Sequence, residues 1–404
     1  MNTNLERPIT NKESVSVFAS LSESWGTRER TLLKDAEIAQ DNKLNPVIFC
    51  KKGSFLAKNA NAVGFPVIYH LGKVQGHIFK WYKFRNFSNY LNSKNINFIH
   101  CYDLRILWVL CFLLRNMPMT PLFLTITSEL KKSYLEIWHK TLISRVDQVF
   151  VFSDSISEEV RLRLGIVPRK ITKLGYGVDV QPVTKTIITK VKKELGITSG
   201  VFSVGSILSP HFKDLEPILP LIYAVIGFNQ KYLDGTHVKL ILISEEKWNK
   251  NPLYQDLIRF IKDAGCEEDV LFYSGTTLEV FQRSVDLWLG IFEGYHISDF
   301  AIQALLNEIP ILVPRNSEVM ELIDTYSGIG EAYRREDSFG LREKMEKVLL
   351  NKKTYQKEVI KNSKIISATH RKSLYVDDLL GRYNKIMAAR VRAASKKSLL
   401  PSNK

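Results

Sequence analysis

The sequence predicts an α/β protein made of two Rossmann-like domains, each a parallel sheet with helices between its strands. The first observation is a β-α-β-α-β rhythm from Ser14 to Tyr69, in which short apolar runs alternate with helical segments. The second is a similar rhythm that starts again at Val201. The third is length, because 404 residues allow two domains that each bury a full core.

The elements of the first half follow in order along the chain. Ser14 to Ser20 alternates as a half-buried strand does, and the turn at 24–30 opens a helix expected over 31–40. Further strands are expected at 45–50, 65–69, 97–100, 121–126 and 149–153, and further helices after Gly53-Ser54 and at 80–92, 106–115 and 155–164.

A charged helix at 184–195 is expected to bridge to the second half. Strands there are expected at 202–204, 238–243, 270–273, 285–292 and 311–313, with late helices at 341–350, 357–366 and 375–389. The domains that follow are a flexible N-terminus (1–13), a first Rossmann-like domain (14–182), a second (183–370), a C-terminal helix packing back on the first domain (371–389) and a basic disordered tail (390–404).

Composition narrows the class of protein. A formal net charge of +15 favours anionic partners, but no RNA-binding motif or zinc-ligand spacing is present, so nucleic acid is not expected. Four cysteines without CxxC spacing indicate reduced thiols and a cytoplasmic protein. The N-terminus has no apolar signal segment, and the longest apolar run, 106–114, is too short to cross a bilayer.

The stretch from Val285 to Pro314 has the pattern of a ligand site. It is expected to form a strand, a loop containing Glu293, a helix capped by Ser298 and a second strand. A carboxylate after a parallel strand, followed by a helix N-terminus, is where open α/β sheets bind ligands. That N-terminus favours a phosphate.

The same stretch resembles the donor-sugar signature of GT-B glycosyltransferases, in particular the retaining family 4 group. Glu293-Gly294-Tyr295 matches the start of the signature and Pro310 its end, while Gln303 stands where the family has a second Glu. The resemblance spans about residues 14–385 and implies two Rossmann-like domains facing across a cleft, the first for the acceptor and the second for a nucleotide-sugar donor.

Other motifs extend the resemblance into both halves. Trp25-Gly26-Thr27 is similar to the family's Trp-Gly-Gly turn, and Gly205-Ser206 with Lys213 is similar to its Gly-Arg…Lys loop. This sequence departs from the family at Ser206, where an Arg is expected, and at Thr127, where a His is expected. An Arg-to-Ser change removes a bidentate phosphate contact, which puts the strength of donor binding in doubt.

The resemblance implies a role for each matched residue. Glu293 is expected to be catalytic, by contacting sugar hydroxyls and supporting positive charge at the anomeric carbon. The expected donor-binding residues are Gly26, Thr27, Ser206, Lys213, Tyr295, His296, Ile297 and Gln303, of which Gln303 would contact the ribose. No metal and no resident cofactor are expected; the donor, a UDP or GDP sugar, is a substrate.

The implied function is transfer of a sugar, with retention, to a surface glycan or a lipid-linked acceptor, as in lipopolysaccharide synthesis. The basic and aromatic segment Lys80 to Arg85 suggests contact with an anionic membrane at the inner face of the plasma membrane. Two alternatives stay open. The departures at Thr127, Ser206 and Gln303 fit a weak or inactive GT-B protein that acts as a binding subunit, and a sugar-nucleotide epimerase is a further GT-B activity.

Overall fold

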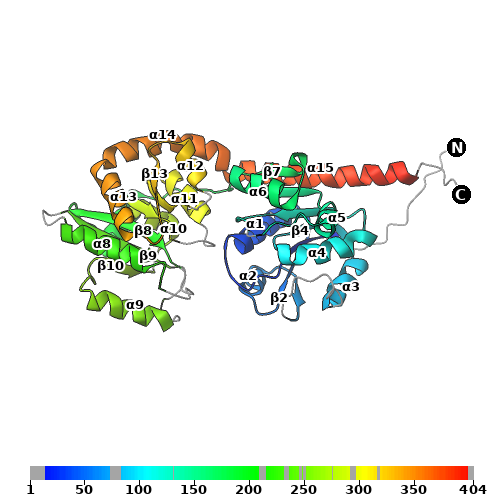
Figure 1. The fold of residues 1–404 in the computed structure, drawn as a ribbon, viewed down its shortest axis with the longest axis horizontal. Helices are drawn as coiled ribbons and strands as arrows, with labels where there is room; N and C mark the ends of the chain where they lie inside the picture. The colour runs from blue at the N-terminus through cyan, green and yellow to red at the C-terminus, as the bar shows by residue number, and fades with distance from the viewer. Residues whose placement is uncertain are drawn as a thin grey trace. The chain divides into compact units, whose positions relative to one another are not determined.

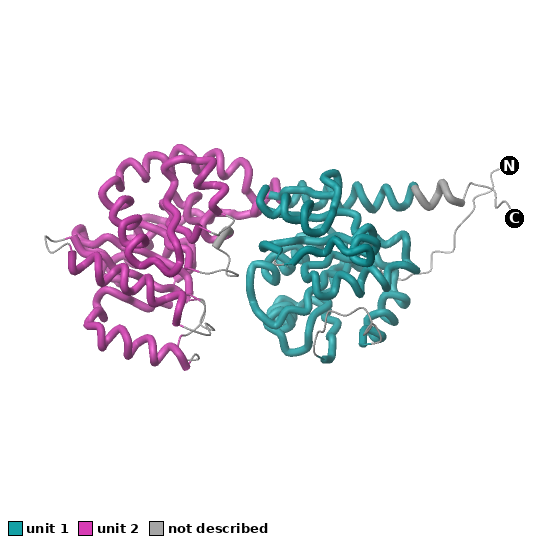
Figure 2. Tube along the Cα trace, viewed as in Figure 1, with its two compact units in different colours: residues 1–174, 376–404 teal, residues 175–375 magenta. Residues whose placement is uncertain are grey.

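The computed structural model describes residues 14–72, 83–130, 132–208, 215–231, 236–244, 248, 252–274, 276–291, 297–315 and 319–398. The chain divides into two compact units (Figures 1 and 2). The first unit takes the chain up to Leu174 and again from Val376, and the second takes Gly175 to Tyr375. Residues 175–182, which the sequence assigns to the first domain, therefore pack with the second unit.

The first unit is built on a seven-stranded parallel sheet in the order β3-β2-β1-β4-β5-β6-β7. The strands are β1 (Ser14–Ser20), β2 (Pro46–Lys51), β3 (Val67–His70), β4 (Asn95–Cys101), β5 (Leu122–Thr125), β6 (Gln148–Val151) and β7 (Ile171–Lys173). Every residue of β5 and β6 is buried, as expected for parallel strands that helices cover on both faces. The predicted doubly wound sheet is confirmed.

Seven helices belong wholly or partly to this unit among the described residues. They are α1 (Thr27–Asp41), α2 (Phe55–Val63), α3 (Arg85–Ser93), α4 (Leu104–Leu113), α5 (Ile137–Ile143), α6 (Asp154–Leu164) and the C-terminal α15 (Lys372–Ser398) (Figure 1). The helix expected over 80–92 begins only at Arg85. Phe84 is buried, and its ring stacks on His70 with centroids 4.7 Å apart. Phe84 thus belongs to the core and not to the expected membrane surface, and Lys80, Trp81 and Tyr82 lie outside the described residues.

The second unit repeats the arrangement with a six-stranded parallel sheet in the order β10-β9-β8-β11-β12-β13. The strands are β8 (Val201–Ile207), β9 (His237–Ile243), β10 (Val270–Tyr273), β11 (Leu287–Leu289), β12 (Ile311–Pro314) and β13 (Gly330–Tyr333). The sequence did not predict β13, because Gly-Glu-Ala-Tyr has no apolar run. Strand β13 forms by pairing with β12. A Cβ at Gly330 would lie 2.1 Å from the carbonyl oxygen of Ile311 on β12, so glycine is needed there.

Helices of the second unit include two short ones that the sequence analysis did not resolve, α10 and α12. The set is α7 (Lys185–Glu194), α8 (Leu219–Lys231), α9 (Pro252–Asp263), α10 (Leu278–Ser284), α11 (Ile297–Leu306), α12 (Met320–Thr325), α13 (Ser338–Leu350) and α14 (Lys352–His370). A hydrophobic core lies under α8, α9 and α13, with Leu240, Phe228 and Leu341 fully buried.

The glycines of Gly175-Tyr176-Gly177 let the chain pass against the end of α14. A Cβ at Gly175 would lie 2.3 Å from the carbonyl oxygen of Thr369, and Gly177 has a φ of +63°, which favours glycine. The amide of Val178 donates to the carbonyl of His370 at 2.8 Å. The motif therefore has an architectural role.

Helix α15 packs on the sheet of the first unit through Tyr383. This side chain is fully buried, and its hydroxyl lies 2.6 Å from Nδ1 of His100 on β4. The helix continues to Ser398, nine residues past the expected end at Ala389, and Arg390 pairs with Asp147 on the way. Within the described part of the chain, no helix combines the length and apolar content that crossing a bilayer requires.

Candidate functional site

Each sheet reverses its strand order at one point, and open α/β sheets bind ligands beside the carboxyl ends of the strands at such points. In the first unit the reversal lies between β1 and β4, and in the second between β8 and β11. In the chain, most of the sequence-predicted site residues follow the ends of β1, β8 and β11. Ser206 lies within β8 itself, and Ile297 and Gln303 lie in α11.

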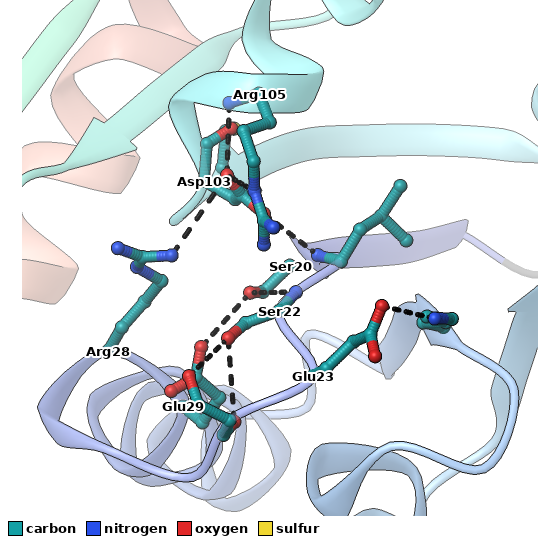
Figure 3. Close-up of polar contacts among 11 residues, drawn as sticks. Ser20, Ser22, Glu23, Arg28, Glu29, Asp103 and Arg105 are labelled. Carbon is teal, nitrogen blue, oxygen red and sulfur yellow. Dashed lines mark hydrogen bonds and ion pairs between the residues drawn. The ribbon is translucent and has the colours of Figure 1, made fainter. Parts of the chain in front are cut away.

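At the first point, the Glu29 half of a capping box closes the turn from β1 into α1. Gly26 is the N-cap, and its amide donates to Oε2 of Glu29 at 3.0 Å, while the hydroxyl of Ser20 donates to Oε1 at 3.3 Å (Figure 3). Gly26 has a φ of −153°, which other residues adopt, so its backbone angle alone does not require glycine. Gly26 is buried, and Thr27 begins the helix half-exposed.

The carboxyl of Glu29 has a raised pKa because its side chain is buried. Its side chain is buried in the turn, with the residue 2% exposed. Burial raises the pKa of its carboxyl above the ordinary value, although the charge of Arg28 and hydrogen bonds from Ser22 and Gly26 act in the opposite direction. The carboxylate already accepts the Gly26 amide, so the N–H groups left for an anion at this helix start are those of Thr27 and Arg28.

Asp103 connects the two sides of this crevice. It caps α4 directly after β4, accepts from Nε and Nη2 of Arg105 at 2.9 and 2.7 Å, and accepts from the amide of Leu21 at the end of β1. Nη1 of Arg28, on α1, lies 4.0 Å from the same carboxylate (Figure 3). Burial alone would raise the pKa of Asp103, but the hydrogen bonds from Arg105 and the charge of Arg28 outweigh it and lower the pKa.

Two guanidinium groups therefore converge on one buried carboxylate, and the carboxyl of Glu29 lies near enough to interact with both of them. The side chains of Arg28 and Arg105 are 33% and 46% exposed, so each presents N–H donors to solvent beside the start of α1. Guanidinium groups match phosphate and carboxylate oxygens well. Neither arginine is among the site residues predicted from the sequence. The available signal was that Arg28 and Arg105 follow strands that become neighbours in the sheet.

At the second point, two hydroxyls hold the end of β11. Ser206 on β8 is fully buried and donates to the carbonyl of Leu289, and Tyr333 on β13 donates to the carbonyl of Gly290 at 2.7 Å. The chain leaves this anchored end towards Glu293. The hydroxyl of Ser206 thus has a partner within the sheet, and its contact with a donor stays a prediction.

Four predicted site residues lie outside the described residues. These are Glu293, Tyr295, His296 and Lys213. The structure does describe Ile297, which begins α11, so this helix starts one residue before the Ser298 that the sequence predicts as its cap. The start of α11 follows β11 in the chain after a gap of seven residues, 290–296, as the predicted strand, loop and helix require.

Gln303 lies in the second turn of α11 and faces α10. Its Nε2 donates to Oε1 of Glu279 at 2.9 Å, and the residue is 8% exposed. One turn on, Asn307 donates to Gln282 at 3.0 Å, and Gln282 donates to the carbonyl of Phe300 at 2.8 Å. A carboxylate in place of Gln303 would repel Glu279, so the amide at this position fits its neighbour.

Thr127 and His100, considered for sugar contact from the sequence, lie near the carboxyl ends of β5 and β4. Thr127 is 8% exposed, and His100 is fully buried with Nε2 2.7 Å from the hydroxyl of Thr125. Burial lowers the pKa of His100 well below its ordinary value, which keeps the ring neutral. His100 therefore has a structural role in the first unit. Among the described residues, no cluster of three His, Cys, Asp or Glu side chains could hold a metal ion.

No protein-family model matches the chain, and no curated protein matches its sequence. Solved structures resemble it over nearly its full length. A glycosyltransferase from Rickettsia africae has a TM-score of 0.74 at 13% identity, covering 93% of this chain and 99% of its own. HepE of Anabaena, in complex with UDP, has a TM-score of 0.70 at 14% identity, covering 92% of this chain and 100% of its own.

The fold is GT-B. It is shared with the lipopolysaccharide outer core galactosyltransferase WaaB, which has a TM-score of 0.60 at 13% identity and covers 93% of this chain and 99% of its own. The GT-B fold predicted from the sequence is confirmed by these likenesses together with the two parallel sheets. At such identities a likeness establishes the fold and leaves the activity to be argued from the residues.

Proposed function

We propose that the chain is a glycosyltransferase that moves a sugar from a nucleotide-diphosphate sugar to a hydroxyl of a surface glycan or lipid-linked acceptor, with retention. One observation carries the proposal. At the reversal point of the second sheet, the chain leaves an anchored β11 into Glu293-Gly294-Tyr295 and enters α11 at Ile297. A structure of the same fold, HepE, has been solved in complex with UDP-glucose.

Each site residue has a separate role in the proposed reaction. Glu293 contacts sugar hydroxyls and supports positive charge at the anomeric carbon. Main-chain N–H groups of Tyr295, His296 and Ile297, with Lys213, stabilise the leaving diphosphate, because a helix N-terminus and a cation both favour developing negative charge. Gln303 keeps its carbonyl oxygen for a ribose hydroxyl while its amide nitrogen donates to Glu279.

In the first unit, the turn at Gly26 and Thr27 is the proposed phosphate contact, through the N–H group of Thr27, because the amide of Gly26 already donates to Glu29. We place the protein in the cytoplasm, at the inner face of the plasma membrane, where nucleotide sugars and lipid-linked acceptors meet. UDP and GDP sugars are the donors to test first.

Donor titration and turnover test the proposal directly. The chain is titrated calorimetrically with a panel of UDP and GDP sugars, and transfer to the source organism's glycan lipid is followed by mass spectrometry. Glu293→Gln should lower turnover about 100-fold or more with the fold intact, since it removes a charge used in the transition state. The exposed Glu336→Gln, in the same unit, is the matched control and should leave turnover unchanged.

A binding or partner subunit with little activity is the second candidate. Two observations favour it: the Ser206 hydroxyl is bound to Leu289, and the Gln303 amide is bound to Glu279. Absence of heat with every donor at millimolar concentration would end the enzymatic proposal and support this one. Conversion of a donor sugar without any acceptor would instead indicate an epimerase.

A further inference from the structure

The second unit contains a pocket of about 510 Å³ at the end of α14, which we name the α14 pocket. The connecting segment 178–180 lines one part of it, and Leu306 from the last turn of α11 lines another. The rest of the lining includes Lys364 and Ser367 of α14 and its C-cap residue, Arg371. All of these residues belong to the second unit (Figure 2). Pockets of this size that bring a few polar groups together are typical of ligand sites.

Two cations enter the α14 pocket from the same helix. Lys364 and Arg371 are seven residues apart, which is two helical turns or about 10 Å along the axis, so their side chains leave the same face. Ser367 falls between them. Within the part of the chain that the structure describes, neither charged group and not the hydroxyl of Ser367 makes a hydrogen bond or ion pair. Their donors are therefore available to a ligand.

Asp179 adds an acceptor to the same pocket. Its residue is exposed, and among the described residues its carboxylate forms no ion pair with either cation. The main chain fixes its position, because the amide of Val178 donates to the carbonyl of His370 at 2.8 Å and Val178 pairs with Arg371 in a parallel bridge. The pocket thus holds a free carboxylate together with two free cations.

The charged groups of the lining leave a net positive charge. Lys364 and Arg371 stand against Asp179 alone. Two further acids lie nearby in the chain: Glu308 is exposed two residues beyond the end of α11, and Glu358 pairs with a lysine of its own helix at 3.4 Å. Neither of them lines the pocket. The lining therefore favours a ligand that combines an anionic group with hydrogen-bond donors.

We propose that the α14 pocket binds a small phosphorylated sugar or polyol, with its phosphate on the two cations and its hydroxyls on Asp179. Guanidinium and ammonium groups match phosphate oxygens, and a carboxylate accepts hydrogen bonds from hydroxyls. The half-buried apolar part of the lining, which includes Val178 and Leu306, contacts the C–H groups of the ligand.

The α14 pocket is distinct from the proposed donor site. Helix α11 begins after the carboxyl end of β11 and leads the chain back to the amino end of β12. Ile297 in the first turn of α11 is a proposed diphosphate contact, whereas Leu306 in the last turn lines the α14 pocket. Binding in this pocket does not rest on the proposed transferase activity.

Calorimetric titration of the full chain tests the proposal with three probes: glucose 1-phosphate, glucose and inorganic phosphate. We expect glucose 1-phosphate to bind at least about tenfold tighter than either of the other two, because only this probe engages both the cations and the carboxylate. Its affinity should fall as salt is added, since the cations are exposed.

A double variant removes the cations. Lys364→Gln/Arg371→Gln should lose at least about tenfold in affinity for glucose 1-phosphate, because glutamine donates hydrogen bonds without a charge. The matched control is Lys353→Gln/Lys357→Gln, which removes the same charge from exposed positions of α14 outside the pocket. The affinity of the control should equal that of the parent. All four side chains are exposed, so both variants should keep the fold.

Asp179→Asn separates the two kinds of contact. It should weaken the binding of glucose 1-phosphate, whose hydroxyls lose a charged acceptor, and tighten that of inorganic phosphate, which loses a repulsive neighbour. Hydrogen exchange locates the ligand independently. Glucose 1-phosphate should slow exchange at 178–180 and in the last two turns of α14, and leave α1 unchanged.

The proposal fails on any of three results. The first is no saturable binding of glucose 1-phosphate to the parent at millimolar concentration. The second is an equal loss of affinity in the two double variants, which would show a diffuse effect of charge. The third is slowed exchange at the start of α11 in place of α14, which would put the ligand in the proposed donor site. Loss of turnover in Glu293→Gln, by contrast, should leave the affinity for glucose 1-phosphate unchanged.

Discussion

Asp103 shows how one side chain can fix the geometry of a crevice. It is held between the end of β1, the start of α4 and Arg28 of α1, so three elements depend on its charge. Its carboxylate is buried, and a buried charge is stable only while its partners remain.

Asp103→Asn tests this role. The change keeps the shape but leaves Arg28 and Arg105 without their anion, and it should cost about 1–3 kcal/mol, less than for a fully buried pair because the arginines are partly in solvent. Urea unfolding of both proteins measures the cost. Asp337→Asn is the control, since this exposed cap of α13 only accepts the amide of Gly340, and it should change little.

The pH dependence of that cost has a definite sign. The pKa of Asp103 is lowered in the folded protein, so its contribution to stability is present above its ordinary value of 3.8. The contribution is lost as pH falls through the lower, folded value. The stability difference between the parent and Asp103→Asn should therefore be constant at neutral pH and shrink in acid. A difference that grows as pH falls would contradict the assignment.

Tyr333 has a different role, because it acts through the main chain. Tyr333→Phe should free the carbonyl of Gly290 and cost about 1 kcal/mol of stability, as the loss of a buried hydrogen bond does. The loop that bears Glu293 should then be less well placed, so turnover should fall. Tyr355→Phe, which loses a bond to Glu331 in the same unit, is the control. Equal kinetics for both variants would rule out a positioning role.

At the scale of elements, two backbone segments can approach closely only where one of them has a residue without a side chain. Gly175→Ala would place a methyl group 2.3 Å from the carbonyl of Thr369, and neither backbone can move without disturbing α14. We expect a loss of about 3 kcal/mol or more in the stability of the second unit, as for severe overpacking. Gly381→Ala is the control: nothing lies within 4 Å, and alanine in a helix should stabilise by up to about 1 kcal/mol. Thermal unfolding of the two variants should shift in opposite directions.

At the scale of the whole molecule, the end of the chain completes the first unit. Tyr383 is 283 residues from its partner His100, and its ring also packs on Phe98 and Phe123 of the sheet. Tyr383→Ala should destabilise the first unit by about 3–5 kcal/mol. Hydrogen exchange should show faster exchange in β4 and β5 and unchanged exchange in β8. The exposed Asn384→Ala is the control, and equal loss of protection in both sheets would contradict the division into units.

The structure and the sequence agree most closely where a pattern is local and long. The strand at Ser14–Ser20 and the strand at Val270–Tyr273 have the predicted bounds. Their burial was not predicted: the alternating strand is buried on both faces, where a half-buried one was expected, and the apolar strand at the edge of its sheet is mostly only partly buried. The predicted and observed elements agree less well where contacts between distant segments determine the structure. Strand β13 forms because Gly330 fits against β12, and α5 forms although two of its residues face water.

The sequence by itself determined the two parallel-sheet domains and the order of most strands and helices. These features follow from periodicity and from short motifs, both of which involve residues that are close together in the chain. The site at Glu293, which motivates the proposed function, stays a prediction, because Glu293 lies outside the described residues. The tertiary structure decided what distant residues do together: Asp103 with Arg28 and Arg105, Tyr333 with Gly290, Gln303 with Glu279 and Tyr383 with His100. Such pairs depend on strand order and packing, which cannot be read from any one segment. Contacts across a sheet are set by the energy of the whole fold.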